Sequence, residues 1–127
     1  VGSEMCIRDS LQLPVKIFIW NNQGYASIRS MQNNNFGGFQ VASGESSGLS
    51  MPDTVKVAAA YGLKTFRIMD NKQLEQRIEE VLNAEGPVLC ELMISPDETV
   101  SPRTKTIVHE DGSMESYPLE KMWPCVE

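Results

Sequence analysis

Three short predicted strands, separated by helical patterns, constrain what this chain can fold into more than any other feature. Residues 63–69 form one of them, residues 14–20 are a nearly continuously apolar run of β-branched and aromatic side chains, and residues 88–94 are apolar except for Glu91. Such runs are typical of strands that are covered on both faces. No hairpin turn separates them, so right-handed crossovers are expected between parallel strands. We therefore predict an α/β fold with an open, mainly parallel sheet in three layers.

Helix signals fill the spaces between these strands. Residues 25–32 favour a short helix, and a second helix is predicted from about residue 50 to residue 61. This second helix has a candidate cap in Ser50 and an acid, Asp53, in its first turn. Residues 37–50 hold four glycines and four serines and predict a long loop, of a kind that is usually functional or mobile.

A third helix is predicted after Asp70, which forms a second capping pattern with Gln73. Its apolar positions fall on one face at Leu74, Ile78, Val81 and Leu82. Glu91 is the charged residue inside the third strand. It is either a buried acid with a raised pKa or, as we favour, an acid at an edge position or in a salt bridge. Further core positions are predicted at Tyr61, Phe66 and Met69.

The amino-acid composition limits the kinds of partner that this chain is expected to bind. Eleven Lys and Arg against seventeen Asp and Glu give a formal net charge of −6, which disfavours a nucleic-acid surface. No apolar run approaches the roughly 20 residues that span a bilayer, so no membrane association is expected. The three cysteines, Cys6, Cys90 and Cys125, lie far apart, so neither a zinc knuckle nor a redox pair is indicated. Cys90 fits a small core residue, and we expect a cytoplasmic protein.

The two ends of the chain differ from its middle. Residues 1–10 show no apolar periodicity and resemble translated sequencing-adapter DNA, so we expect a non-native leader there. Residues 11–94 carry the α/β pattern. Residues 95–127 hold four of the seven prolines, and the Asp111-Gly112 pair predicts a small hairpin. We expect this tail to pack on the domain or on a partner subunit, with Trp123 as the docking side chain.

Polar residues gather where the first strand ends, in the sequence Asn21-Asn22-Gln23-Gly24-Tyr25. Ligands of open α/β sheets bind beyond the carboxyl ends of the strands. A side-chain amide oxygen suits Mg²⁺, a glycine lets the backbone present a carbonyl, and the following helix start attracts phosphate. The pattern thus indicates half of a site for a magnesium-bridged diphosphate. The structural alternative stays open, because an Asn pair is also a common way to leave a sheet.

Several separated blocks of the sequence carry a resemblance to a known family. Residues 14–29, Pro-Val-Lys-Ile-Phe-Ile-Trp-Asn-Asn-Gln-Gly-Tyr-Ala-Ser-Ile-Arg, resemble the end of the cofactor motif of thiamine-diphosphate-dependent enzymes. Residues 51–68, residues 86–94 and the closing Pro-Leu-Glu-Lys-Met-Trp-Pro continue the similarity in order. The acetolactate synthase-like branch is the most similar one. The resemblance implies the C-terminal part of the diphosphate-binding domain, with a fold that is incomplete at its N-terminus.

The resemblance also implies roles for single residues. Asn22 would ligate Mg²⁺ through its side-chain oxygen and Gly24 through its backbone carbonyl, whereas Asn21 would brace the turn. Ser27 would face the reactive side of the cofactor and contact the substrate. The residues expected to approach the diphosphate of thiamine diphosphate, largely through main-chain groups, are Gln23, Tyr25 and Ala26.

The family's Gly-Asp-Gly motif and its activating glutamate are not found in this sequence. We therefore expect no catalytic residue in this fragment and no activity of the fragment alone. The parent enzyme implied by the resemblance makes or breaks a carbon–carbon bond next to the carbonyl of a 2-oxo acid, as a homodimer or homotetramer. The alternative is a stand-alone, non-catalytic α/β module that binds a nucleotide or has a regulatory role.

Overall fold

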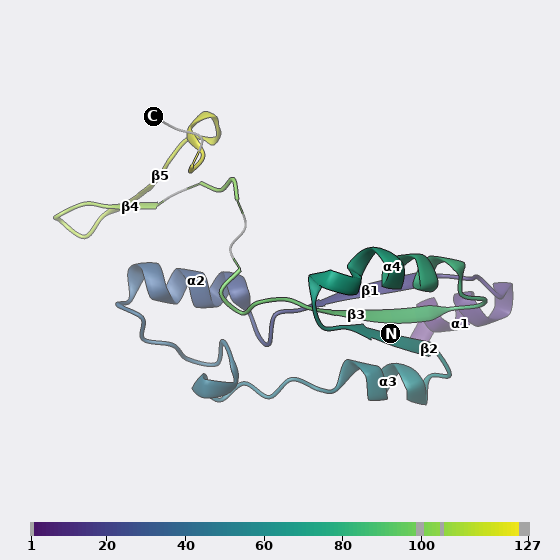
Figure 1. The fold of residues 1–127 in the computed structure, drawn as a ribbon. Helices are drawn as coiled ribbons and strands as arrows, with labels where there is room; N and C mark the ends of the chain where they lie inside the picture. The colour runs from purple at the N-terminus through teal and green to yellow at the C-terminus, as the bar shows by residue number, and fades with distance from the viewer. Residues whose placement is uncertain (1, 99–100, 105, 125–127) are drawn as a thin grey trace.

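The computed structural model describes residues 2–98, 101–104 and 106–124, with side chains described from residue 7 onward. Its centre is a three-stranded, wholly parallel sheet in the strand order β1-β3-β2 (Figure 1). The predicted open, parallel α/β sheet is therefore confirmed. The elements are α1 (Gly2–Leu11), β1 (Lys16–Asn21), α2 (Ala26–Asn35), α3 (Thr54–Ala60), β2 (Lys64–Ile68), α4 (Leu74–Asn83), β3 (Val88–Met93), β4 (Thr106–Val108) and β5 (Met114–Ser116), with 3₁₀ turns at Glu45–Ser47, Asn71–Gln73 and Leu119–Lys121.

Helices α3 and α4 cover opposite faces of the sheet and make it the middle of three layers (Figure 1). Alternation along the strands sends successive side chains to opposite faces. Against α4 lies one apolar cluster, formed by Ile68, Val81, Val88 and Cys90 with Phe18, Phe66, Ile78, Ala84 and Leu92 around it. Against α3 lies a second cluster, formed by Ala58, Leu63 and Leu89 with Ile17 and Ile19 beside it. The central strand β3 contributes to both, which explains why its sequence is apolar except for Glu91.

Helix α3 begins later than its sequence predicted. Asp53, and not Ser50, caps it: the Asp53 backbone is extended and its carboxylate accepts a hydrogen bond of 3.2 Å from the Lys56 N–H. Pro52 precedes the helix and fixes φ just before this cap. A carboxylate at this position also interacts favourably with the positive end of the helix dipole.

Two predicted core residues are exposed in the structure. Tyr61 is 53% exposed as the C-cap of α3, and Met69 is 68% exposed immediately after β2. Each of these residues directly follows the last residue of its element. Its side chain therefore does not continue the face of that element that packs into an apolar cluster. Phe66, in the middle of β2, packs as predicted. Only two of the four apolar residues predicted on one face of α4 are packed against the sheet, namely Ile78 and Val81. The other two, Leu74 and Leu82, are 38% and 57% exposed.

Capping at Asp70 is more local than predicted. Its carboxylate accepts a hydrogen bond of 2.8 Å from Lys72 N–H and caps the short 3₁₀ turn, and α4 begins only after it. Gln73 is the N-cap of α4 but makes no capping side-chain bond.

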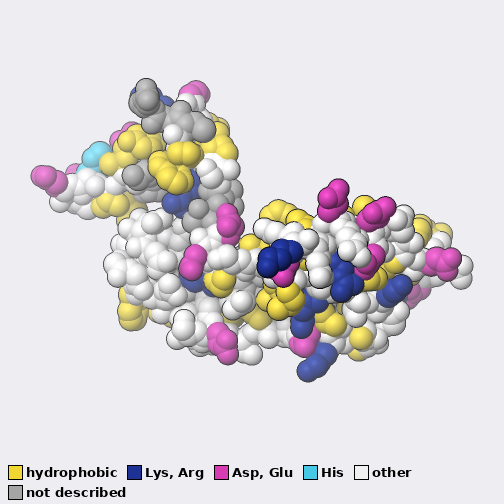
Figure 2. All heavy atoms as spheres, in the orientation of Figure 1, with side chains coloured by type: hydrophobic (Ala, Val, Ile, Leu, Met, Phe, Trp, Pro, Cys, Tyr) yellow, Lys and Arg dark blue, Asp and Glu magenta, His cyan; other side chains and the backbone are white. Residues whose placement is uncertain are grey.

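The C-terminal tail forms the predicted hairpin from β4 and β5, with Gly112 at the turn in a positive-φ conformation. The hairpin lies beside α2 and away from the sheet (Figure 1). Trp123 contacts the tail itself, because its backbone bridges Arg103 and its ring lies 5.6 Å from the Arg103 guanidinium. Apolar side chains remain exposed on this lobe (Figure 2), among them Val108, Met114 and Leu119.

Other features bear on the sequence predictions. Residues 2–11, within and just after the expected leader, are helical. Among the residues described, no helix has the length and apolar character that crossing a bilayer requires. Cys90 is a free, fully buried thiol, and burial raises its pKa. Cys125 lies outside the described residues, as do Val1 and Lys105.

Candidate functional site

The site is a tight turn at the carboxyl end of β1. Asn21 ends the strand, and its side-chain oxygen accepts a hydrogen bond of 2.9 Å from the backbone N–H of Gln23. This bond holds Gln23 in the left-handed region, at φ +59°, where a non-glycine residue is uncommon. Asn21 therefore braces the turn, as predicted.

Gly24 is the point at which the turn and the glycine- and serine-rich loop touch. The N–H of Tyr25 donates a hydrogen bond of 2.9 Å to the carbonyl of Ser43, and Gly24 pairs with Gly44 in an isolated bridge. A Cβ on Gly24 would lie 2.3 Å from the Ser43 carbonyl oxygen, and φ at Gly24 is +152°. Only glycine fits here, because this region of φ is open to glycine alone.

Helix α2 starts directly after this turn. Its N-cap, Tyr25, makes no capping side-chain bond, and the first helical bond runs from Arg29 N–H to the Tyr25 carbonyl at 2.9 Å. The N–H groups of Ala26, Ser27 and Ile28 therefore have no helical acceptor. No acidic residue lies in the first turn, so these amides and the helix dipole form a positive pole.

Arg29 ties this turn to two other segments. Its guanidinium donates to the carbonyls of Asn22 at 3.0 Å, of Ser43 at 3.2 Å and of Pro96 at 2.8 Å. The three acceptors belong to the turn, to the loop and to the start of the tail. The sequence offered no signal for this role, since Arg29 reads simply as a polar residue of a short helix.

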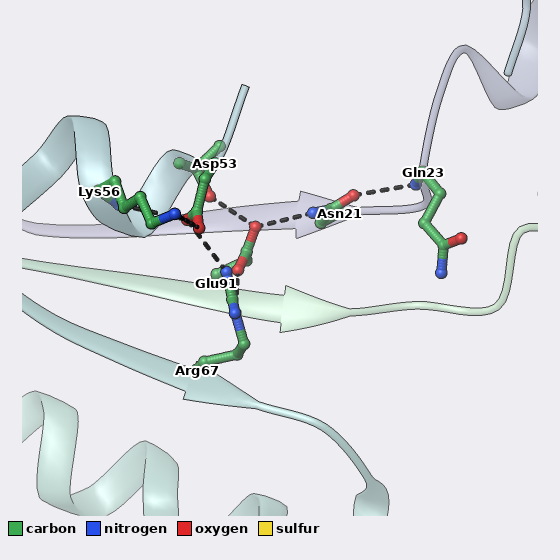
Figure 3. A network of polar contacts seen from close by, with 7 residues as sticks. Asn21, Gln23, Asp53, Lys56, Arg67 and Glu91 are labelled. Carbon is green, nitrogen blue, oxygen red and sulfur yellow. Dashed lines mark hydrogen bonds and ion pairs between the residues drawn. The ribbon is translucent and has the colours of Figure 1, made fainter. Parts of the chain in front are cut away.

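A buried acid underlies the same turn (Figure 3). Glu91 is 1% exposed on β3, and its Oε1 accepts hydrogen bonds from Asn21 Nδ2 at 2.7 Å and from Thr54 Oγ1 at 2.5 Å. Its Oε2 accepts a charged hydrogen bond from Arg67 Nε. The favoured salt-bridge interpretation of Glu91 is confirmed, although β3 is the central strand and not an edge.

The pKa of Glu91 is lowered, so the raised pKa that we also considered is wrong. Burial alone would raise the pKa, but the hydrogen bonds from Thr54, Asn21 and Arg67, together with the positive charge of Arg67, outweigh it. The same partnership raises the pKa of Arg67. Asp53, which lies 3.2 Å from Arg67 Nη2, has its pKa lowered by the hydrogen bond from Lys56 N–H and, to a smaller extent, by Arg67.

Two cavities lie near the turn and the start of α2. One, of about 550 Å³, has Asn21 and Gln23 in its wall together with Arg67 and Glu91. The other, of about 480 Å³, lies between α2 and the tail and is lined in part by Ala26 and Ser27. Of the predicted site residues, Gln23 lines the first cavity, Ala26 and Ser27 line the second, and Asn22, Gly24 and Tyr25 line neither.

The donor atoms at the turn fit a hard cation. Within the described chain, the Asn22 side-chain amide makes no hydrogen bond, and neither does the carbonyl of Gly24. Both are neutral oxygen donors of the kind that Mg²⁺ accepts beside phosphate oxygens. The described residues contain no cluster of three or more His, Cys, Asp or Glu side chains that could hold a metal by themselves. A cation here would therefore depend on oxygen ligands from elsewhere.

An open parallel sheet with a polar turn and a helix start at the carboxyl edge defines a cofactor- or nucleotide-binding α/β domain. The comparisons with known proteins narrow this class. The family described as "Thiamine pyrophosphate enzyme, C-terminal TPP binding domain" matches residues 5–92, more than half of the chain. The chain therefore belongs to this family of thiamine pyrophosphate-binding domains.

The similar curated proteins reported next are all named as acetolactate synthases. The chain is 31% identical over 111 residues to "Acetolactate synthase isozyme 2 large subunit" of Escherichia coli (strain K12), which covers 87% of this chain and 19% of that protein. It is 31% identical over 101 residues to "Acetolactate synthase, mitochondrial" of Schizosaccharomyces pombe, covering 80% of this chain and 14% of that one. It is 31% identical over 91 residues to "Acetolactate synthase large subunit" of Cyanidium caldarium, covering 72% of this chain and 15% of that protein. The chain thus spans less than a fifth of the length of these relatives.

Proposed function

We propose that this chain forms the C-terminal part of the domain that binds thiamine diphosphate and Mg²⁺ in an acetolactate synthase-like enzyme. The observation that carries the proposal is the turn at residues 21–24, where two oxygen donors and the first amides of the following helix have no hydrogen-bond partner among the described residues. The family match and the acetolactate synthases among the relatives support the same assignment.

In this proposal, the metal ligands are the side-chain oxygen of Asn22 and the backbone carbonyl of Gly24. The hydrogen bond from Arg29 to the Asn22 carbonyl supports this role, because it fixes the backbone on one side and leaves the amide free on the other. Packing of Gly24 on Ser43 supports it as well, since a fixed peptide can present its carbonyl in one direction.

The diphosphate would lie at the start of α2. Gln23, Tyr25 and Ala26 would approach it through main-chain groups, and the unpaired first-turn amides with the helix dipole favour such an anion. Ser27 would face the reactive side, in agreement with its place in the wall of the cavity between α2 and the tail.

Thiamine diphosphate, when bound, supplies the electron sink for making or breaking a carbon–carbon bond next to a 2-oxo acid carbonyl. The residues of this chain bind and orient it, and we propose that they contribute no acid–base group to the reaction. The chain alone would then be inactive. We further propose a cytoplasmic parent, assembled as a homodimer or homotetramer, in which the exposed apolar side chains of α2 and the tail meet other parts of the assembly.

The division of the chain is part of the proposal. Residues 1–10 are a non-native leader, residues 11–94 belong to the cofactor-binding domain, and residues 95–127 are a tail that packs on the domain or a partner subunit. The hydrogen bond of 2.9 Å from Arg103 to Ser30 of α2 supports a docked tail.

The test is binding of Mg²⁺ with thiamine diphosphate to the complete enzyme that carries this segment, measured by titration calorimetry. Asn22→Ala should weaken Mg²⁺-dependent binding about tenfold or more, because one cation ligand is lost. Asn83→Ala, at the exposed last residue of α4 and away from both cavities, is the matched control and should bind as the unmodified enzyme does. Equal affinity of the Asn22→Ala and unmodified enzymes would refute the assignment.

A further inference from the structure

We propose that Glu91 is a positioning residue for the turn at residues 21–24. Its carboxylate fixes the Asn21 amide, the amide holds Gln23, and the turn so held directs the Asn22 side chain and the Gly24 carbonyl. The inference rests on the proposed function for what the turn binds. The positioning itself can be measured without any ligand.

The first step is the burial of Glu91. A carboxylate that is 1% exposed on the central strand is unfavourable unless its oxygens are well bonded. Arg67 alone would neutralise the charge, yet Arg67 occupies only Oε2. Oε1 points the other way along the sheet, toward β1, and receives Asn21 and Thr54 (Figure 3).

Strand register brings these groups together. Glu91 on β3 lies level with Ile19 on β1 and with Arg67 on β2. Asn21 is two residues beyond Ile19 and therefore points to the same face of the sheet. The carboxylate thus lies beneath the last residue of β1, where the turn begins.

The second step is the asymmetry of an amide side chain. Nδ2 of Asn21 can only donate and its Oδ1 can only accept a hydrogen bond. A carboxylate can only accept, so Glu91 selects the orientation in which Nδ2 faces it and Oδ1 faces the Gln23 N–H. The flipped amide would place oxygen against the carboxylate and an NH₂ group against N–H.

The third step is the strain at Gln23. A non-glycine residue in the left-handed region is disfavoured, and Gln23 is held there by the hydrogen bond of 2.9 Å from its N–H to Asn21 Oδ1. If the Asn21 side-chain oxygen is no longer fixed, the backbone at Gln23 can leave the left-handed conformation. The Asn22 side chain and the Gly24 carbonyl then change direction with it.

A first experiment measures the turn in the cofactor-free chain by amide hydrogen exchange of Gln23. In Glu91→Gln the carboxamide can offer either end to Asn21, and exchange at Gln23 should rise about tenfold. Thr54→Val is the matched control, because it removes the other hydrogen bond to Oε1 and leaves the Asn21 contact. It should leave Gln23 exchange unchanged relative to the β1 amides. Equal exchange at Gln23 in Glu91→Gln and in the unmodified chain, or an equal rise in both variants, would overturn the proposal.

A second experiment is a double-mutant cycle on the complete enzyme, titrated with Mg²⁺ and thiamine diphosphate. Asn21→Ala and Glu91→Gln should each weaken binding about 10- to 100-fold, as loss of a ligand-orienting partner does. The double variant should bind no more weakly than the weaker single variant, because Glu91 acts through Asn21. Additive losses, or unchanged affinity in Glu91→Gln, would count against the proposal.

The two inferences fail in different ways. If the unmodified enzyme shows no Mg²⁺-dependent binding, the proposed function is wrong, and the exchange experiment still decides whether Glu91 positions the turn. If binding is present and is lost in Asn22→Ala but not in Glu91→Gln, the function stands and the positioning role is refuted.

Discussion

The guanidinium of Arg29 donates a hydrogen bond of 3.0 Å to the main-chain carbonyl of Asn22, seven residues earlier. Helix α2 thereby contacts the turn that precedes it. Because the same guanidinium also bonds the carbonyls of Ser43 and Pro96, a single side chain fixes the turn, the loop and the start of the tail.

Replacing Arg29 should therefore destabilise the protein although the residue lies outside both apolar clusters. Arg29→Met keeps the aliphatic stem but leaves the carbonyls of Asn22 and Pro96 without this donor, and we expect a loss of about 1–3 kcal/mol in the free energy of unfolding. Urea denaturation measures it. Arg77→Met is the control, since it removes only a half-exposed ion pair with Glu80, and should lose less than about 1 kcal/mol. Equal losses would show that the three carbonyl contacts contribute nothing.

Substitution at Gly24 tests the contact between the turn and the loop. Gly24→Ala places a Cβ 2.3 Å from the Ser43 carbonyl in a conformation that alanine rarely adopts, so the loop must move. We expect a loss of about 2 kcal/mol or more in unfolding free energy, and weaker Mg²⁺-dependent cofactor binding. Gly112→Ala has a positive φ but open space around it, and should lose only about 1 kcal/mol, with binding unchanged. Thermal unfolding and calorimetry decide between a strained contact and an open one.

Acid should destabilise the protein partly through Glu91. Its pKa is lower in the folded chain than the ordinary value of 4.5, so the stabilisation is complete above that value and is lost as the pH falls through the folded pKa. In Glu91→Gln, the decline in unfolding free energy below about pH 4.5 should be shallower, with the remainder due to groups such as Asp53. Urea denaturation at a series of pH values measures the slope. Parallel curves for the two proteins would contradict a lowered pKa for Glu91.

Removal of residues 1–10 should leave the fold intact. The two apolar clusters, as described, draw their residues from position 17 onward, so the leader side chains that the structure describes, at residues 7–10, add nothing to either. We expect the midpoint of thermal unfolding to change by less than about 4 °C, equivalent to less than about 1 kcal/mol. Circular dichroism during heating tests this expectation. A larger fall would show that helix α1 belongs to the native domain.

Local patterns were sufficient for most of the architecture. The apolar residues of the strands and the helical segments of the crossovers between them are both local patterns, so both were visible in residues 14–94. The hairpin at Gly112 was visible for a similar reason, since its turn depends on adjacent residues. The exact N-cap at Asp53 was not, because Ser50 and Asp53 both offered a capping side chain and the backbone conformation selected between them.

The contacts around the turn could not be predicted in this way. Glu91 is 24 residues from Arg67, 37 from Thr54 and 70 from Asn21, and no spacing in the sequence relates them. Strand order and register decide which side chain meets which, and those depend on the packing of the whole sheet. The sequence by itself determined that a polar turn with an amide pair and a glycine would follow an apolar strand. Only the tertiary structure decided which residues hold that turn, because a buried carboxylate takes its partners from whichever strands lie beside it.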